Sequence, residues 1–285
     1  MTAKLTTVRA GALTTVQDSG RRGHAHLGVP RSGALDATAM RLANRLLGND
    51  PDAAVLETTL TGCALRPDHP VTAVVGGAHC PVTVDGRPVA WGAPVRVPAG
   101  AVLNVGTATA GVRSYVAVAG GITTEPVLGS RSTDLLSGLG PGPLRAGHVV
   151  RVGTPARPVA PAVAVPWPGP PGELVLPVRL GPRADWFTPS ALRTLTSVTY
   201  RVSPHSNRIG LRTEGPPLER ATTGELPSEG IVLGAVQVPP DGRPVIFLHD
   251  HPTTGGYPVV AVVAEPALAA AAQATAGTPV RFTPG

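Results

Sequence analysis

Glycine and proline interrupt this chain so often that every regular element must be short. Of its 285 residues, 35 are glycine and 33 are proline, yet 42% are hydrophobic and these are spread along the whole length. Both residues end helices and strands, whereas the valine-rich alternating segments between them are typical of half-buried strands. Because only 3% of the residues are aromatic, valine, leucine and alanine must form the core. We therefore predict a mainly β protein with a few helices, built from barrels or sandwiches.

A proline-rich segment divides the sequence. Seven prolines lie within residues 154–172, and such a run favours an extended linker because proline cannot donate a hydrogen bond to a sheet. The pentapeptide DGRPV occurs once on each side, with Asp85-Gly86 and Asp241-Gly242 placed as in hairpin turns. The predicted organisation is an N-terminal unit over residues 1–155 with a helix over residues 36–47, a linker over residues 156–171 and a C-terminal unit over residues 172–285.

Three segments have helical character. Residues 36–47 place apolar side chains on one stripe and are followed by Gly48, which can take the left-handed conformation that ends a helix. Thr188-Pro189 combines a capping residue with proline at the first helical position. Residues 265–273 are rich in alanine and are followed by Gly277. We expect a short helix in each of these places.

Charge and lysine content exclude several classes of protein. Lys4 is the single lysine and follows no glycine loop, so this chain contains neither a P-loop nor a biotin attachment site, and Schiff-base catalysis has no suitable amine. The formal net charge is +6, but the arginines are scattered and do not form a basic patch interleaved with aromatic residues. The charge therefore does not indicate a nucleic-acid-binding protein.

Cysteine usage and hydropathy indicate a soluble cytoplasmic protein. Cys63 and Cys80 are too few for a disulfide framework, and we predict that both are buried thiols in a reducing compartment. The N-terminal residues lack the pattern of a secretory leader. The most apolar stretch, residues 258–276, contains Glu265 and a proline, so it does not predict a membrane span.

Familiar catalytic and metal-binding motifs are missing from the sequence. His249 and His251 flank Asp250, and on a strand the two imidazoles would lie on one face and could share a metal ion. A strand end with two hydrogen-bonded histidines explains the same pattern more simply. We predict no metal site.

Four other segments are dense in polar residues that neither packing nor turn formation requires. Their glycines would let backbone amides approach a ligand, their arginines would hold a carboxylate or phosphate, and their acids could move protons. Each segment alone is equally compatible with a polar turn held by an arginine ion pair. The segments are residues 17–36, 129–134, 203–212 and 228–258.

Taken in order, the motifs of these segments resemble one family. The motifs are QDSGRRG, VPRSGALD, ANRLLGN, GSRSTD, SNRIGLR, SEGIVLGAVQVPPDGRP and TTGGYP, and they extend from about Leu13 to Val263. They are similar to those of the proteins described as biotin-dependent carboxyltransferase, allophanate hydrolase subunit 2, Kip-inhibitor antagonist and C-type 5-oxoprolinase subunit. The resemblance implies a tandem pair of cyclophilin-like β-barrel units.

The resemblance also implies an activity. As a separate polypeptide the chain looks like a subunit of an ATP-dependent 5-oxoprolinase, a hydrolase complex that opens the 5-oxoproline lactam to glutamate. Its implied partners are a B-type, Kip-inhibitor-like subunit and an A-type subunit of the LamB/YcsF kind. ATP would be used by the complex without necessarily binding this chain.

Two alternatives remain open from the resemblance. One is the second half of a biotin-dependent carboxyltransferase of a urea or amide carboxylase, with biotin on a partner. The other is a regulator that binds a Kip-inhibitor-like protein and does no chemistry. Many family members carry a lysine directly after TTGGYP, whereas this chain has Val259, which weakens the carboxyltransferase interpretation.

The same motifs supply candidate site residues for an amide substrate, and we expect the site at or near a subunit interface. Asp18, Asp36 and Glu229 are the expected catalytic acids or bases. The residues expected to bind the substrate are Gln17, Arg21, Arg31, Ser32, Asn44, Ser206, Asn207, Arg208, Arg212, Gln237, Thr254, Gly255, Gly256 and Tyr257.

Overall fold

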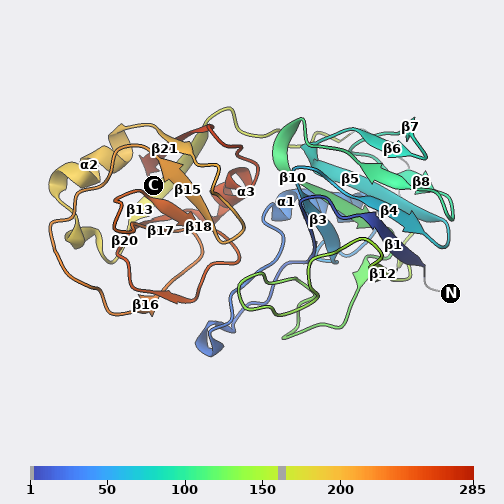
Figure 1. Cartoon of the computed structure of the whole chain (residues 1–285), viewed down its shortest axis with the longest axis horizontal. Coiled ribbons are helices and arrows are strands. Elements are labelled where there is room, and N and C mark those ends of the chain that lie inside the picture. The colour runs from blue at the N-terminus through green and yellow to red at the C-terminus, as the bar shows by residue number, and fades with distance from the viewer. Residues whose placement is uncertain (1–2, 160–164) are drawn as a thin grey trace. The chain divides into compact units, whose positions relative to one another are not determined.

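The computed structural model describes residues 3–159 and 165–285, and the chain divides into two compact units (Figure 1). Unit 1 comprises Met1–Arg21 and Ser32–Pro170, and unit 2 comprises Arg22–Arg31 and Pro171–Gly285. Part of the predicted linker over residues 156–171 lies outside the described residues. The predicted domain limits therefore stay a prediction.

Unit 1 contains a seven-stranded and a five-stranded sheet. In spatial order, the larger sheet consists of β11 (Ile122–Thr123), β12 (Val149–Val152), β1 (Lys4–Arg9), β4 (Ala64–Pro67), β9 (Leu103–Val105), β6 (Val82–Val84) and β7 (Arg87–Pro88). The smaller sheet consists of β2 (Leu13–Gln17), β3 (Val55–Thr59), β10 (Ala110–Val118), β5 (Val71–His79) and β8 (Val95–Val97). All of their strand pairs are antiparallel.

The main core of unit 1 is built from both sheets. Leu5 and Leu65 of the larger sheet share one buried apolar cluster with Val16, Leu56 and Val116 of the smaller sheet. The neighbouring residues of these strands point the other way, because side chains alternate across a strand. The smaller sheet therefore has a second apolar face.

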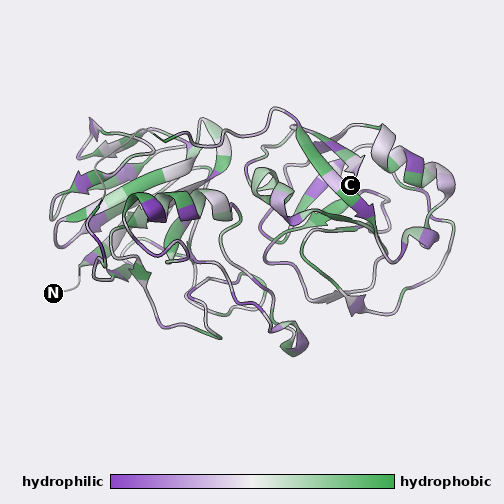
Figure 2. Ribbon diagram, turned by 180° about the vertical axis from the view of Figure 1, so that it is seen from behind, coloured by the Kyte–Doolittle hydropathy of each residue, from purple (hydrophilic) through white to green (hydrophobic). Residues whose placement is uncertain are grey.

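Helix α1 (Ala37–Leu46) covers that second face. Met40 and Ala43 pack with Val74 and Tyr115 in a separate buried cluster, and Figure 2 shows hydrophobic and hydrophilic residues alternating along the helix. Asp36 caps the helix by accepting a hydrogen bond from the Ala39 amide at 2.9 Å. The predicted helix is confirmed, and it begins directly after the motif VPRSGALD, which ends at Asp36.

Unit 2 contains a closed seven-stranded barrel. The last strand lies beside the first in parallel orientation and closes the barrel, with Leu174 opposite Val280. Around the barrel the order is β13 (Leu174–Leu180), β20 (Val259–Val263), β17 (Ala235–Gln237), β18 (Val245–Phe247), β15 (Gly210–Glu214), β14 (Tyr200–Val202) and β21 (Pro279–Pro284). A separate two-stranded sheet pairs β16 (Glu229–Gly230) with β19 (Thr254–Gly255).

The remaining helical segments of unit 2 are short. Helix α2 (Pro189–Ser197) begins as predicted, with Thr188 accepting a hydrogen bond from the Ala191 amide. The alanine-rich segment begins at Glu265 as expected but is helical over fewer residues, as η3 (Glu265–Ala267) and α3 (Leu268–Ala271). Two other single 3-10 turns are η1 (Ala25–Leu27) and η2 (Ala184–Trp186).

The two DGRPV segments form different turns. Asp85 and Gly86 both have positive φ and join β6 to β7 directly, so the predicted tight hairpin is confirmed there. Gly242 also has positive φ and lies between the antiparallel strands β17 and β18. That connection is longer because the adjoining prolines have no amide hydrogen for a sheet ladder.

The mainly β class is therefore confirmed, and one unit is a closed barrel, whereas the two sheets of the other are not closed. Cys63 and Cys80 are buried free thiols, as predicted, and burial raises the pKa of Cys63 to about 12. Within the described ranges, no helix has the length and apolar character needed to cross a bilayer.

Candidate functional site

Asp18 joins two loops of unit 1. Its Oδ1 accepts hydrogen bonds from the Ser130 and Ser132 hydroxyls, both at 2.6 Å, and from the Gly20 amide at 2.8 Å. Its Oδ2 accepts from the Arg131 amide at 2.6 Å, and the side chain is 7% exposed. Such a carboxylate has its lone pairs committed to the fold. The loop after β2 and the loop around residues 130–132 are thereby held together.

The Arg21 side chain donates hydrogen bonds to the same loops of unit 1. Its Nη2 donates to the Ser132 carbonyl at 2.5 Å, its Nη1 to the Ser32 hydroxyl at 3.1 Å and its Nε to the Val127 carbonyl at 3.3 Å. The side chain is fully buried. Arginine is suited to such a role because its planar group presents donors in fixed directions. Arg21 therefore fastens three chain segments to one another.

Gln17 and Asn44 also bond to the backbone of unit 1. The Gln17 amide nitrogen donates to the Thr15 hydroxyl at 3.0 Å and to the Thr133 carbonyl at 3.1 Å. The Asn44 amide nitrogen donates to the Ala53 carbonyl at 2.8 Å, near the far end of α1 from Asp36. Both side chains are completely buried.

A buried glutamate that the sequence did not single out supports the segment before α1. Glu57 Oε2 accepts hydrogen bonds from the Leu35 amide and the Tyr115 hydroxyl, both at 2.9 Å. The Tyr115 hydroxyl in turn accepts from the Asp36 amide at 2.8 Å, and burial raises the pKa of Tyr115 well above its ordinary value. The sequence signal was a lone acid within the otherwise uncharged strand VLETT.

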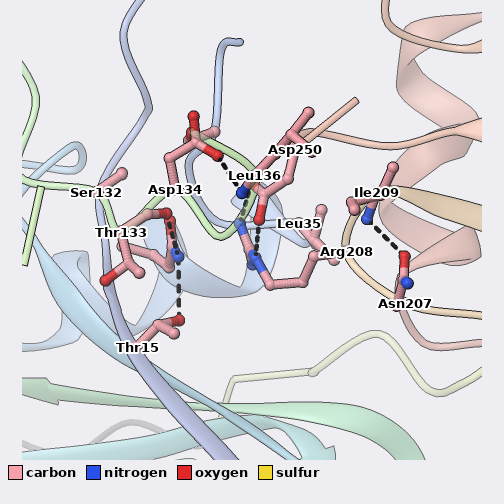
Figure 3. Close-up of polar contacts among 12 residues, drawn as sticks. Thr15, Leu35, Ser132, Thr133, Asp134, Leu136, Asn207, Arg208, Ile209 and Asp250 are labelled. Carbon is pink, nitrogen blue, oxygen red and sulfur yellow. Dashed lines mark hydrogen bonds and ion pairs between the residues drawn. The ribbon is translucent and has the colours of Figure 1, made fainter. Parts of the chain in front are cut away.

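In unit 2, Arg208 and Asp250 form a buried two-point ion pair. Arg208 Nε lies 2.8 Å from Asp250 Oδ2 and Nη2 lies 3.0 Å from Oδ1 (Figure 3). The exposed fractions of the two side chains are 1% and 0%. Asp250 was absent from the candidates, although it follows the buried strand β18. Beside this pair, Asn207 Oδ1 accepts hydrogen bonds from the amides of Ile209 and Gly210 and shapes the turn.

The histidines on either side of Asp250 are both buried. The Nδ1 atom of His251 is 2.7 Å from the Pro252 carbonyl, and burial lowers the pKa of His251 below its ordinary value. Across the described parts of the chain, no three His, Cys, Asp or Glu side chains converge in a group that could hold a metal ion.

The β16–β19 sheet brings together residues that lie far apart in the sequence. Glu229 of β16 pairs with Gly255 of β19, and the Gln237 amide nitrogen donates to the Tyr257 carbonyl at 3.0 Å. A Cβ atom on Gly255 would lie 2.6 Å from Ile231 Cδ1 and 3.0 Å from Gln237 Nε2. A larger residue there would force the ends of the Ile231 and Gln237 side chains to shift, so glycine permits the close approach of the two segments.

Arg183 is a further member of this group that the sequence did not reveal. It precedes η2 and forms a two-point ion pair with Glu229, with Nε 3.0 Å from Oε2 and Nη2 in contact with Oε1. The Arg183 guanidinium lowers the pKa of Glu229 below its ordinary value. The segment that contains β19 is partly exposed, at Thr254, Gly256 and Tyr257. Tyr257 retains 45% of its accessible surface.

The remaining candidates lie elsewhere in unit 2. Arg31 Nη1 is 2.7 Å from Glu265 Oε1. Ser206 accepts a hydrogen bond from the Arg212 amide at 3.0 Å, while the Arg212 side chain is exposed on the outside of the barrel. The structure therefore groups Gln17, Asp18, Arg21 and Ser32 in unit 1, and Glu229, Gln237 and residues 254–257 in unit 2.

Comparison with known proteins identifies the family. Residues 27–284 match the family model described as carboxyltransferase domain, subdomain A and B. The C-type 5-oxoprolinase subunit of Escherichia coli (strain K12) is 37% identical over 282 residues, which cover 96% of this chain and 89% of the relative. The crystal structure of TTHA0988 is similar with a TM-score of 0.89 and 37% identity over 99% of this chain.

A longer protein is similar as well. The crystal structure of the K. lactis urea amidolyase gives a TM-score of 0.89 at 30% identity, covering 99% of this chain but only 18% of that one. Our chain spans 56% of the TTHA0988 chain, so it is about half the length of that protein. The extent of the matches shows that this chain belongs to the family of the carboxyltransferase domain, subdomains A and B.

Proposed function

We propose that this chain is the C-type subunit of an ATP-dependent 5-oxoprolinase, which opens the lactam of 5-oxoproline to glutamate. The observation that carries the proposal is the near-complete match to the C-type 5-oxoprolinase subunit of E. coli, with 96% of this chain and 89% of the relative aligned. The urea amidolyase match, by contrast, covers a small part of a much larger protein. The more extensive alignment therefore favours the 5-oxoprolinase subunit over the urea amidolyase.

Opening a lactam requires charge stabilisation at its carbonyl and a group that accepts a proton. In our proposal the group around β16 and β19 contacts the substrate, because its exposed Thr254, Gly256 and Tyr257 can reach a ligand. Glu229 is ionised at neutral pH, since Arg183 lowers its pKa. The same lowering makes Glu229 a weaker base, so it would hold a positive charge or a donor group of the substrate, and Arg183 would keep it in place.

Asp18, Arg21 and Gln17 have a different role in this proposal. Their polar atoms are engaged by neighbouring loops, so they position chain segments and do not move protons. Asp36 caps α1, and Arg208 is paired with Asp250. These residues would affect the reaction through the shape of the loops that they hold.

The proposed fold family and partners follow from the resemblance of the sequence motifs. The two units would both be cyclophilin-like and would form a tandem pair. The partners would be a B-type, Kip-inhibitor-like subunit and an A-type LamB/YcsF subunit, acting in the cytoplasm. The complex would use ATP, which need not bind to this chain.

The proposal is tested by expressing the chain together with the A-type and B-type proteins encoded beside it. Purified complex, 5-oxoproline and ATP should yield glutamate, and omission of ATP or of this chain should abolish the product. If all three proteins are soluble and associated but form no glutamate, the proposal is wrong. Full activity without this chain would instead indicate a regulator.

The carboxyltransferase alternative is favoured by one observation, the TM-score of 0.89 to the K. lactis urea amidolyase. It requires a biotinylated partner, since the single lysine of this chain is Lys4. An avidin blot of the native complex distinguishes the two functions. A biotinylated band that co-purifies with the chain supports carboxyl transfer, and its absence supports the 5-oxoprolinase.

A further inference from the structure

The outer face of the unit 2 barrel carries a polar hollow of about 360 Å³. Its charged lining comprises Arg212, Arg243, Glu214 and Asp241, with His205 beside them. Small-molecule sites commonly have volumes of roughly 300–1,000 Å³, so the hollow is large enough for a small metabolite. Its lining contains none of the residues grouped around Glu229.

The strand register explains why these charges share one face. Arg212 of β15 lies opposite Val245 of β18, and the Thr213 amide donates to the Pro244 carbonyl at 3.2 Å. Two residues further along, Glu214 therefore lies opposite Arg243 in this antiparallel pair. Leu211 and Thr213 between them are buried, so the charged side chains of β15 point outward from the barrel.

Two guanidinium groups in the hollow are available to a ligand. In the ranges that the structure describes, the side chains of Arg212 and Arg243 have neither a hydrogen bond nor an ion pair, and only backbone atoms of the two residues are engaged. Guanidinium groups bind carboxylates with two parallel hydrogen bonds. The hollow can therefore receive two carboxylate groups.

Each of the two acids in the hollow uses one carboxylate oxygen in a hydrogen bond within the chain. Glu214 Oε1 accepts a hydrogen bond from the Ser203 hydroxyl at 2.9 Å, and Asp241 Oδ1 accepts from the Arg243 amide at 3.1 Å. The second oxygen of each carboxylate has no donor among the described residues. These oxygens can accept hydrogen bonds from an ammonium group.

We propose that this hollow binds an α-amino dicarboxylate, with its two carboxylates on Arg212 and Arg243 and its ammonium between Glu214 and Asp241, bound by both. The mixed lining selects against other ligands. A phosphate or polyphosphate would meet two carboxylates, and an uncharged amide would offer neither guanidinium group the two-point hydrogen bonding that a carboxylate gives. L-glutamate has the required groups. Its choice as the ligand rests on the proposed function, in which it is the product.

Isothermal titration of the full-length chain with L-glutamate tests the proposal. Glutamate should bind, and Arg243→Gln should weaken its affinity by about tenfold, as expected for loss of one charged hydrogen-bonding partner. Glu214→Gln should weaken glutamate binding by a similar factor. It should not weaken the binding of glutarate, which has both carboxylates but no ammonium. The matched control is Arg281→Gln on β21, which removes an ion pair with Glu173 and should leave the affinity unchanged.

Circular dichroism establishes that each variant is folded. The proposal is overturned if the folded wild-type chain gives no heat with glutamate, if Arg243→Gln and Glu214→Gln both bind like wild type, or if inorganic phosphate binds as tightly. The titration needs neither ATP nor partner subunits. A chain that binds glutamate within an inactive complex contradicts only the proposed function, whereas an active complex with no binding at this hollow contradicts only this inference.

Discussion

Arg183 and Glu229 face each other in a two-point ion pair, with Arg183 Nε 3.0 Å from Glu229 Oε2. Arg183 lies between β13 and η2, and Glu229 belongs to the small β16–β19 sheet. The pair therefore connects this sheet to a segment that follows a barrel strand. About a third of each side chain is exposed, so solvent screens the attraction and the pair acts mainly on the position and ionisation of Glu229.

Replacing Arg183 with Gln should raise the pKa of Glu229 toward its ordinary value of 4.5, because the guanidinium hydrogen bond is the main cause of the lowering. The stabilisation from this pair is present above the unfolded pKa and is lost as the pH falls through the lower, folded pKa. The measurement is an NMR pH titration of the Glu229 carboxyl carbon. In Arg281→Gln, which breaks a comparable exposed pair, the Glu229 titration should not move. An unchanged Glu229 pKa in Arg183→Gln would contradict the assignment.

Replacing Asp18 with Ala should lower the free energy of unfolding by about 3 kcal/mol, because four donors lose a charged acceptor in a buried place. Urea denaturation gives this value. The matched control is Asp52→Ala, which removes an exposed ion pair with Arg41 and should cost less than about 1 kcal/mol. A folded Asp18→Ala chain of wild-type stability whose complex is inactive would show instead that Asp18 is catalytic.

Breaking the Arg208–Asp250 pair from one side should cost about 3–5 kcal/mol, since the remaining charge is left buried. The double variant Arg208→Met with Asp250→Leu should be less destabilised than the sum of Arg208→Met and Asp250→Leu, because neither charge then remains without a counter-ion. Chemical denaturation of the three variants provides the double-mutant cycle. Additive losses would mean that the two residues act independently.

Gly255→Ala should lower both the melting temperature and the activity of the complex, because the new methyl group would lie 2.6 Å from Ile231 Cδ1. Ile231→Val removes that atom and should restore part of the loss in the double variant. Gly230→Ala in the paired strand is the control, as no atom of the described residues lies within 4 Å of its Cβ position. Thermal unfolding and glutamate formation measure the two effects. Equal losses for the two glycine variants would refute the packing argument.

Local chemistry allowed several features to be predicted from sequence. The Asp85-Gly86 turn and the helix after Asp36 each depend on a few adjacent residues, and both formed as expected. The end of the alanine-rich helix was overestimated, because helix propensity alone does not fix the residue at which a helix ends. The family resemblance also proved right, since it rested on seven motifs in order along most of the chain.

Contacts between distant residues could not be predicted in the same way. The carboxylate of Asp18 meets hydroxyls 112 and 114 residues away, and Glu229 meets Arg183 across 46 residues. An isolated Asp or Arg looks the same in sequence whether it will bind a ligand or be paired within the fold. Glu57, Arg183 and Asp250 escaped notice for this reason, and only the folded chain distinguishes engaged groups from available ones.

The strand β21 has a consequence for how the protein is made. It lies between β13 and β14 in the barrel and pairs with both, so the register of Leu174 with Val280 must be established across more than a hundred residues. Such distant pairings slow folding. The barrel of unit 2 cannot close until residues 279–284 have left the ribosome, whereas the strands of unit 1 are complete much earlier. In a nascent chain, the two sheets of unit 1 should therefore fold while the barrel of unit 2 is still open. The unpaired edge strands of that open barrel need protection during synthesis.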